Sequence, residues 1–372
     1  MWPPRANNLG TLLNNLGELA RARKRFEEAL RIYRKLAGAE PGAHLPRVAM
    51  TLNNLGGLLG DLGERAQARK HYEEALGIRR KLAEGEPGAY LPELATTLNN
   101  LGVLLSDLGE QSPAREHYEE ALRIRRKLAR AEPGAYLPDV AVTLNNLGIL
   151  LNDLGERGPA RKHHEEALAI RRKLAEAEPG AYLPDVAVTL NNLGVLLSNL
   201  GEGGLARKHH EEALRIRRKL AEAEPGAYLP DVATTLNNLG NLLSNLGEHT
   251  PAREHYEEAL RIYRKLAEVE PAAYLPDVAM TLNNLGNLLS DLGERTLARE
   301  HYEEALHTYR KLAEAEPQVF LERLRSVIHN ANLLAQESDT AADDWPALKD
   351  AKETLVRLER SLGEVARHKR AA

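Results

Sequence analysis

The sequence contains no cysteine, which excludes a disulfide framework and any zinc or iron–sulfur site with cysteine ligands. Aromatic residues make up only 4% of the chain, and acidic and basic residues nearly balance, with a formal net charge of -4. No apolar run approaches the roughly 18 residues of a membrane-spanning helix. We therefore expect no membrane segment and no attraction to nucleic acid. The first residues lack the apolar core of a signal peptide, so we expect a cytoplasmic protein.

What the chain does contain is a repeat. The tetrapeptide Asn-Asn-Leu-Gly recurs every 46 residues without insertion or deletion. Its seven copies begin at Asn7, Asn53, Asn99, Asn145, Asn191, Asn237 and Asn283. A degenerate eighth copy follows at Ile328 to Leu334. A constant period of this length predicts one supersecondary unit stacked many times.

Proline and glycine set the expected helix ends inside each unit. In the copy at residues 182–227, one helix is predicted from Pro184 to Leu200, with Gly201 as a left-handed C-terminal cap. A second helix is expected from about Leu205 to Glu224, ended by Pro225. Ala, Leu, Glu, Arg and Lys dominate both segments and favour helix. Each unit is therefore predicted to be a pair of antiparallel helices.

The apolar residues of the first helix fill one continuous half of a helical wheel. A single neighbour cannot cover so wide an arc, so we expect this helix to pack on its partner and on the adjacent unit. Gly194 lies inside the helix although glycine costs about 1 kcal/mol there relative to alanine. This indicates a close approach of two helix backbones at that residue.

The same residues carry a resemblance to a known family. The matching positions are Leu190, Leu193, Gly194, Leu197, Ala206, His210 and Ala213. Sister copies place Tyr72, Tyr118, Tyr256 and Tyr302 where this copy has His210. The pattern resembles the tetratricopeptide repeat and is most similar to the kinesin light chain type and its bacterial relatives. The resemblance implies an all-α, right-handed superhelical solenoid of antiparallel helix pairs, with about sixteen helices.

We assign seven repeats to residues 1–320 and a degenerate eighth repeat, with a polar loop at 338–344, to residues 321–372 as a C-terminal cap. The first copy starts part-way through its unit, which leaves apolar surface uncovered. We therefore expect end-to-end self-association through residues 1–35. A fragment of a longer protein is an equally open interpretation of the same start.

The Asn-Asn pair needs a reason, because asparagine costs up to about 0.7 kcal/mol inside a helix relative to alanine. On the wheel Asn191 points to the concave surface, where its amide can bond an extended peptide backbone. The resemblance implies the same role, since groove asparagines bind peptides in this family. Asn192 borders the apolar arc and is expected to bond the neighbouring unit. For Asn191 the alternative is a structural ladder between repeats, and for Asn192 the alternative is contact with the ligand.

Differences between copies gather on the same face. The third to fifth copies carry aliphatic residues there, flanked by Asp107 and Asp153, where the other copies carry more polar or smaller residues. No Lys or Arg occupies the inner-face sites, which argues against a clamp for a C-terminal carboxylate. The predicted groove consists of Asn99, Asn145, Asn191, Asn237, Val103, Val142, Ile149, Val188 and Val195.

Two further recurring groups are interpreted as structural. One histidine per unit, such as His209, recurs at repeat spacing, and residues about 10 Å apart cannot share one metal ion. The basic run from Arg215 to Lys219 is balanced by acidic residues in the same unit, which predicts a solvated convex face.

Nothing in the sequence resembles a catalytic constellation, because every candidate group is a periodic copy. We predict a non-enzymatic scaffold, without metal or cofactor, that binds a protein or peptide segment in its concave groove. Two alternatives stay open. One is the sensor or scaffold portion of a larger signalling protein whose effector domain lies outside this chain, and the other is a self-assembling structural repeat.

Overall fold

The computed structural model describes residues 3–15, 17–337 and 345–371, and these contain sixteen α-helices and no strand. The predicted all-α fold and number of helices are therefore confirmed. The chain divides into two compact units, Met1–Asn192 and Leu193–Ala372, and the boundary falls within one helix. The polar loop expected at 338–344 lies outside the described residues.

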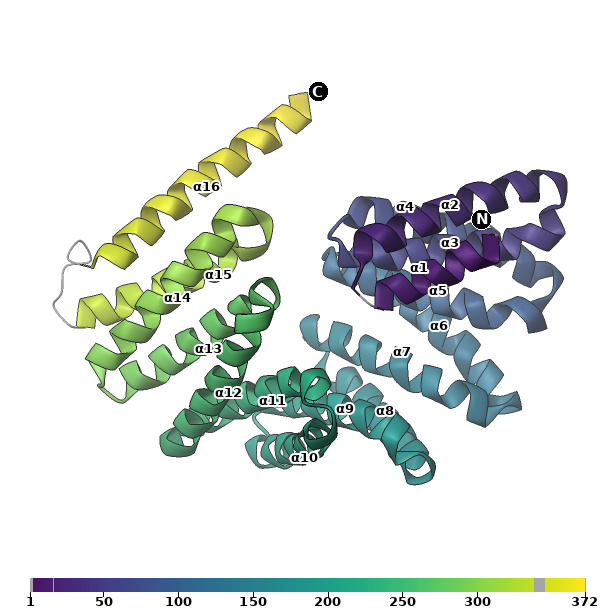
Figure 1. Cartoon of the computed structure of the whole chain (residues 1–372). Coiled ribbons are helices and arrows are strands. Elements are labelled where there is room, and N and C mark those ends of the chain that lie inside the picture. The colour runs from purple at the N-terminus through teal and green to yellow at the C-terminus, as the bar shows by residue number, and fades with distance from the viewer. Residues whose placement is uncertain (1–2, 16, 338–344, 372) are drawn as a thin grey trace. The chain divides into compact units, whose positions relative to one another are not determined.

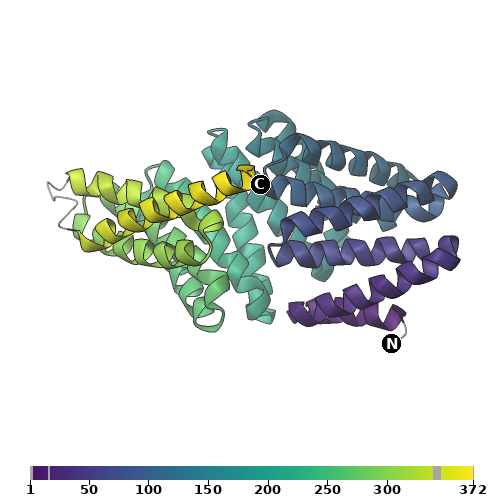
Figure 2. The same ribbon diagram turned by 90° about the horizontal axis from the view of Figure 1, so that it is seen from above.

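The helices of each unit follow one another in chain order (Figure 1, Figure 2). The first unit contains α1 (Pro3–Asn15), α2 (Leu19–Ala39), α3 (Pro41–Asp61), α4 (Arg65–Gly85), α5 (Pro87–Asp107), α6 (Gln111–Ala131), α7 (Pro133–Asp153), α8 (Arg157–Ala177) and most of α9 (Pro179–Asn199). The second contains the end of α9, α10 (Gly203–Ala223), α11 (Pro225–Asn245), α12 (His249–Val269), α13 (Pro271–Asp291), α14 (Arg295–Ala315), α15 (Pro317–Glu337) and α16 (Pro346–Ala371).

Odd and even helices form different layers within a unit. From α1 to α7, each odd-numbered helix contacts the next odd-numbered helix as well as its even-numbered neighbours. The even-numbered helices α2 to α8 make no such contact with one another. The odd helices are therefore the closely spaced layer, and the even helices stand further apart on the other side.

The helices begin earlier than the sequence predicted. Helix α9 starts at Pro179, so Pro184 lies inside it, and Pro225 starts α11 where we expected it only to end the preceding helix. A proline at the first helical position lacks only an N–H that has no partner inside the helix. Glu224 is the single residue between α10 and α11, and its N–H donates to the Leu220 carbonyl at 3.0 Å. One residue with φ of -133° therefore reverses the chain.

The turns from odd to even helices use the predicted glycine cap. Gly201 has a φ of 76°, a left-handed conformation that glycine adopts without a steric penalty. Its N–H donates to the Ser198 carbonyl at 3.0 Å, and the Glu202 N–H donates to the Leu197 carbonyl at 2.9 Å. These two bonds form a Schellman motif, which ends the helix cleanly.

The mid-helix glycine of the repeated odd helices does not mark a close approach of two backbones, as the sequence predicted. A Cβ atom built on Gly148 would lie 2.8 Å from the ring of His164, and one on Gly286 would lie 2.8 Å from the ring of Tyr302. Both rings come from the paired even helix and are buried. The glycine therefore makes room for a ring rather than for a second backbone.

Candidate functional site

The aliphatic residues of the predicted groove lie on the odd helices. Val103 on α5 and Ile149 on α7 are each 40% exposed, and Val142 and Val188 of the same unit are half-buried. Val195, in the part of α9 that belongs to the second unit, is also half-buried. Val103, Val142, Ile149 and Val188 therefore leave apolar surface accessible on the odd helices of the first unit, and we call these four residues the apolar strip.

The four asparagines of the predicted groove are buried, unlike its aliphatic residues. Asn99, Asn145, Asn191 and Asn237 are only 2% to 7% exposed. They lie between odd helices rather than on an open surface. Direct contact of these four amides with a ligand stays a prediction, and their burial favours the ladder alternative.

The ladder itself is a series of side-chain bonds between repeats. The second asparagine of one pair donates through its Nδ2 to the Oδ1 of the first asparagine in the preceding pair. These bonds join Asn100 to Asn53 at 3.4 Å, Asn146 to Asn99 at 3.4 Å, Asn192 to Asn145 at 3.2 Å, Asn284 to Asn237 at 3.3 Å and Asn330 to Asn283 at 3.0 Å. The expectation that Asn192 bonds the neighbouring unit is confirmed.

The position of Val103 and Ile149 is polar in later repeats for a structural reason. Asn241 on α11 accepts a hydrogen bond from the Tyr256 hydroxyl at 2.6 Å, and Asn287 on α13 accepts one from the Tyr302 hydroxyl at 2.7 Å. An asparagine there satisfies a tyrosine of its own repeat. An aliphatic residue makes no such bond, so its exposed surface remains available.

The acidic residues predicted beside the strip are exposed at the ends of their helices. Asp107 ends α5 and Asp153 ends α7. Partial burial raises the pKa of the Asp153 carboxyl above its usual value. The two exposed carboxyl groups therefore border the strip at the ends of α5 and α7.

One arginine in the basic run of each middle repeat is buried, which the sequence did not lead us to expect. Arg125, Arg171 and Arg217 are 4% exposed, so this part of the predicted solvated face is wrong. Arg125 donates through Nη1 to the Asp139 carbonyl at 3.0 Å and to Thr143 Oγ1 at 2.5 Å, both on the next odd helix. A signal was present, because Tyr33, Tyr263 and Tyr309 occupy the same position in other repeats.

The recurring histidines do not converge. The six histidines that recur once per repeat are half-buried: His71, His117, His163, His209, His255 and His301. Burial lowers the pKa of several of them, such as His163. His164 and His210 are fully buried beside the glycines. In the described part of the chain, no three metal-ligating side chains form a cluster.

Comparison with known proteins identifies the family. Tetratricopeptide repeat matches cover residues 5–81, 47–127 and 185–265, and further matches to the same repeat cover 140–179 and 278–317. The chain belongs to the tetratricopeptide repeat family. Among curated proteins, none matches the sequence.

Solved structures with the same fold include a kinesin light chain-like protein, which confirms the resemblance to that type. BtubC (BKLC) from P. vanneervenii is 27% identical over 67% of this chain and 92% of its own, with a TM-score of 0.54. The apo form of RapI is 17% identical over 84% of this chain and 100% of its own, with a TM-score of 0.61. The Rap conjugation gene regulator of plasmid pLS20, in complex with the Phr* peptide, is 16% identical over 86% of this chain and 77% of its own, with a TM-score of 0.54.

None of the helices within the described ranges is both long enough and apolar enough to span a membrane.

Proposed function

We propose that this chain is a non-enzymatic scaffold that binds an extended peptide segment of a partner protein along the odd-helix face of its first unit. The observation that carries the proposal is the exposed apolar strip of Val103, Val142, Ile149 and Val188. The tetratricopeptide repeat is a protein-interaction fold, which supports the general role. Val195 lies further along α9, in the second unit, and stays a separate candidate contact there.

The strip has no evident purpose within its own repeats. Where Asn241 and Asn287 bond a tyrosine, the aliphatic residues Val103 and Ile149 bond nothing and stay exposed. Covering such side chains contributes about 25 cal/mol per Å² of apolar area. A partner that brings apolar side chains to this face gains that free energy without opening the core.

The asparagine ladder supplies polar groups beside the strip. Asn146 and Asn192 are half-buried, and each uses one Nδ2–H in the ladder, although a side-chain amide has two donors and an acceptor oxygen. We assign peptide-backbone contact to these second asparagines. The buried Asn99 and Asn145 then hold them in place by accepting their first hydrogen bond.

The chemistry of the face restricts the partner. The strip carries aliphatic side chains and ends at Asp107 and Asp153, so an acidic segment would be repelled and an apolar, neutral or basic segment would fit. In the Rap regulator of pLS20 this fold holds the Phr* peptide, which supports a peptide as the class of ligand. Its 16% identity concerns the fold alone, so no residue is transferred from it.

The test uses peptides selected from a random library on the intact chain. Ile149→Asp should reduce their affinity at least about tenfold, because a charge would be buried against an apolar side chain. The matched control is Val269→Asp, since Val269 is 80% exposed at the end of an even helix. Equal affinity of both variants for the selected peptides, with unchanged thermal unfolding, would exclude the odd-helix face.

A second candidate interaction is self-association through α1. Leu12 is 54% exposed, whereas Leu58, Leu104 and Leu150 at the same position of later repeats are buried. We propose that a second copy of the chain covers this leucine. Leu12→Glu should then remove concentration-dependent association in sedimentation, and a wild-type chain that stays monomeric at high concentration would contradict the idea.

A further inference from the structure

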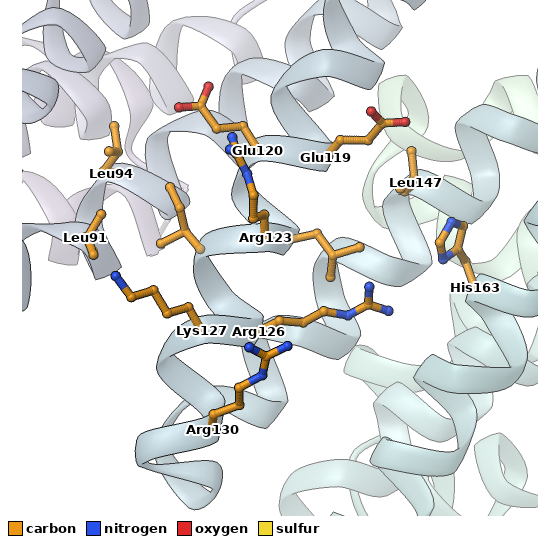
Figure 3. A pocket seen from close by; sticks show the side chains of 12 residues that line it. Leu91, Leu94, Glu119, Glu120, Arg123, Arg126, Lys127, Arg130, Leu147 and His163 are labelled. Atoms are coloured by element: carbon orange, nitrogen blue, oxygen red, sulfur yellow. The ribbon is translucent and has the colours of Figure 1, made fainter.

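A hollow of about 860 Å³ lies on the opposite, even-helix side of the first unit, around α6 (Figure 3). Leucines line it, among them the buried Leu94, Leu122 and Leu147. Basic side chains of α6 surround it: in Figure 3 Lys127 extends toward Leu91, and Arg126 extends toward His163. The hollow exists because consecutive even helices stand apart.

The acidic residues and one of the basic residues of the hollow are already paired. Arg126 donates to Glu166 at 2.6 Å, Glu119 accepts from Arg115 at 2.8 Å and Glu120 accepts from Arg80 at 2.6 Å. Arg123, Lys127 and Arg130 make no hydrogen bond or ion pair with any residue that the structure describes. Three cations on one helix therefore remain without a partner.

These three residues lie on one face of α6, because they are four and three positions apart. Only this repeat is basic at all three places. The position of Arg130 is Glu84, Glu176, Glu222, Glu268 or Glu314 in the other repeats with a charge there. A like-charge pair four residues apart destabilises a helix by about 0.2–0.5 kcal/mol, and both Arg123–Lys127 and Arg126–Arg130 are such pairs. The favourable interaction of Arg130 with the helix dipole is of similar size.

An equivalent hollow in the second unit can be compared with the hollow around α6. A smaller hollow of about 570 Å³ occurs in the second unit around α10, lined at the equivalent positions by Leu214, Arg215, Lys219 and Glu222. There Glu222 lies three residues after Lys219 and offsets one of the two positive charges of the face. The two hollows share a fold and differ in the sign of one charge.

We propose that the hollow around α6 is a second interaction surface, which binds an acidic, leucine-containing segment of a partner protein. The carboxylates of the segment pair with Arg123, Lys127 and Arg130, and its apolar side chains cover the leucines beneath them. A nucleic acid fits less well, because the hollow also contains Glu119 and Glu120 and offers apolar surface rather than a track of cations. The surface is separate from the odd-helix strip and has the opposite charge preference.

The experiment measures fluorescence anisotropy of labelled synthetic peptides with the intact chain at low salt. The first probe alternates Glu and Leu, and the second replaces every Glu with Gln. We expect the Glu peptide to bind at least about fivefold more tightly than the Gln peptide, with affinity that falls as salt rises. Arg130→Glu should weaken the Glu peptide at least about fivefold.

The matched variant is Glu222→Arg, which gives the second hollow the charges of the first. It should add a second, weaker site for the Glu peptide. Ile149→Asp should leave Glu-peptide binding unchanged, which separates this proposal from the strip on the odd helices.

Three results would overturn the proposal. The first is equal Glu-peptide affinity in wild type and Arg130→Glu with both chains folded. The second is a lowered melting temperature of Arg130→Glu without loss of affinity, since Arg130 then serves only the helix dipole. The third is binding of a labelled single-stranded RNA, lost in Arg130→Glu, with no binding of the Glu peptide.

Discussion

The repeat formed by α7 and α8 and the repeat formed by α13 and α14 solve the same packing problem with different side chains. Each buries two large side chains with polar atoms on its even helix. These are His164 and Arg171 in the first repeat, and Tyr302 and Tyr309 in the second. The odd helices that receive these side chains differ at few positions.

Arg171 and Tyr309 donate their hydrogen bonds to different odd helices. Arg171 donates to Thr189 Oγ1 at 2.5 Å and to the Asp185 carbonyl at 3.1 Å, both on the next odd helix. Tyr309 donates to the Pro276 carbonyl at 3.0 Å, on the odd helix of its own repeat. The arginine therefore donates only to the next repeat, whereas the tyrosine donates within its own helix pair and also bonds Arg323 on α15, the next odd helix.

Joining repeats in this way has a cost. Burial lowers the pKa of Arg171, and its Nε has no hydrogen-bond partner among the residues described. A buried cation is retained only where its remaining bonds offset desolvation. The comparison indicates that Arg171 bonds the next repeat at the cost of burying a cation, a cost that Tyr309 does not carry.

The largest effect should come from removing the arginine. Arg171→Ala should lower the free energy of unfolding by about 2–4 kcal/mol, because it leaves a cavity and removes two hydrogen bonds, partly offset by the relief of desolvation. Arg171→Tyr, the residue of the other region, should cost less, since Pro138 offers the carbonyl that Pro276 offers Tyr309. Urea unfolding of both variants measures the difference, and equal losses would show that the position requires a cation.

The next largest effect should come from low pH, which should destabilise the repeat of α7 and α8 more than the repeat of α13 and α14. Burial, with the nearby charges of His163 and Arg171, lowers the pKa of His164 to about 4, against about 6.5 in an unfolded chain. The unfolded state binds more protons between these values, so stability is full above about pH 6.5 and falls as the pH drops toward 4. The loss amounts to at most about 3 kcal/mol for this histidine.

The control for this pH dependence comes from the sister repeats. His164→Tyr places a tyrosine over Gly148, as Tyr302 lies over Gly286, and removes the titrating group. Chemical unfolding at a series of pH values should show a flatter curve between pH 4 and 6.5 for the variant. Parallel curves for wild type and variant would mean that His164 keeps an ordinary pKa.

The glycine beneath the ring should matter in both regions. Gly148→Ala should destabilise by about 1–3 kcal/mol, because its Cβ would lie 2.8 Å from the His164 ring, less the gain in helix propensity. Gly77→Ala on α4 is the matched control, since no atom lies within 4 Å of its added Cβ. It should stabilise by up to about 1 kcal/mol, and melting temperatures that move in the same direction for both would contradict the ring explanation.

The smallest effect should come from the ladder. Asn146→Ala leaves the buried Asn99 oxygen without its bond, which costs about 1 kcal/mol, while alanine regains up to about 0.7 kcal/mol of helix propensity. A slightly lower melting temperature is expected, together with weaker binding of the selected peptides. Asn99→Ala should lower the melting temperature with a smaller loss of affinity. A larger loss of affinity in Asn99→Ala than in Asn146→Ala would instead indicate that the first asparagine contacts the peptide directly.

Several elements followed from the sequence because they depend on local chemistry. The C-terminal cap at Gly201 requires a positive φ, and the period of the Asn-Asn-Leu-Gly motif requires identical helix pairs. The helix starts were less accurate. Pro179 and Pro184 are both compatible with a first turn, and only the packing of the longer helix selects Pro179.

The residues of the candidate site were also predictable only in part. The apolar strip was predictable, because Val103 and Ile149 interrupt a pattern that is polar in later repeats. The burial of Asn145 and Asn191 was not, since a wheel gives the direction of a side chain on its own helix and not the distance to the next one. The burial of Arg217, which the basic run predicted to be one of four exposed cations, was not predictable for the same reason.

The sequence by itself determined the repeat, the helix pairs, the family and the chemistry that each face carries, because these depend on spacing along one chain. The tertiary structure decided which of those residues remain accessible. Odd helices lie close enough for Asn192 to bond Asn145, which buries the first asparagine, while even helices stand apart and leave the Arg130 side of α6 open. That difference is set by the distance between helices, which depends on the side chains of both neighbours packing together.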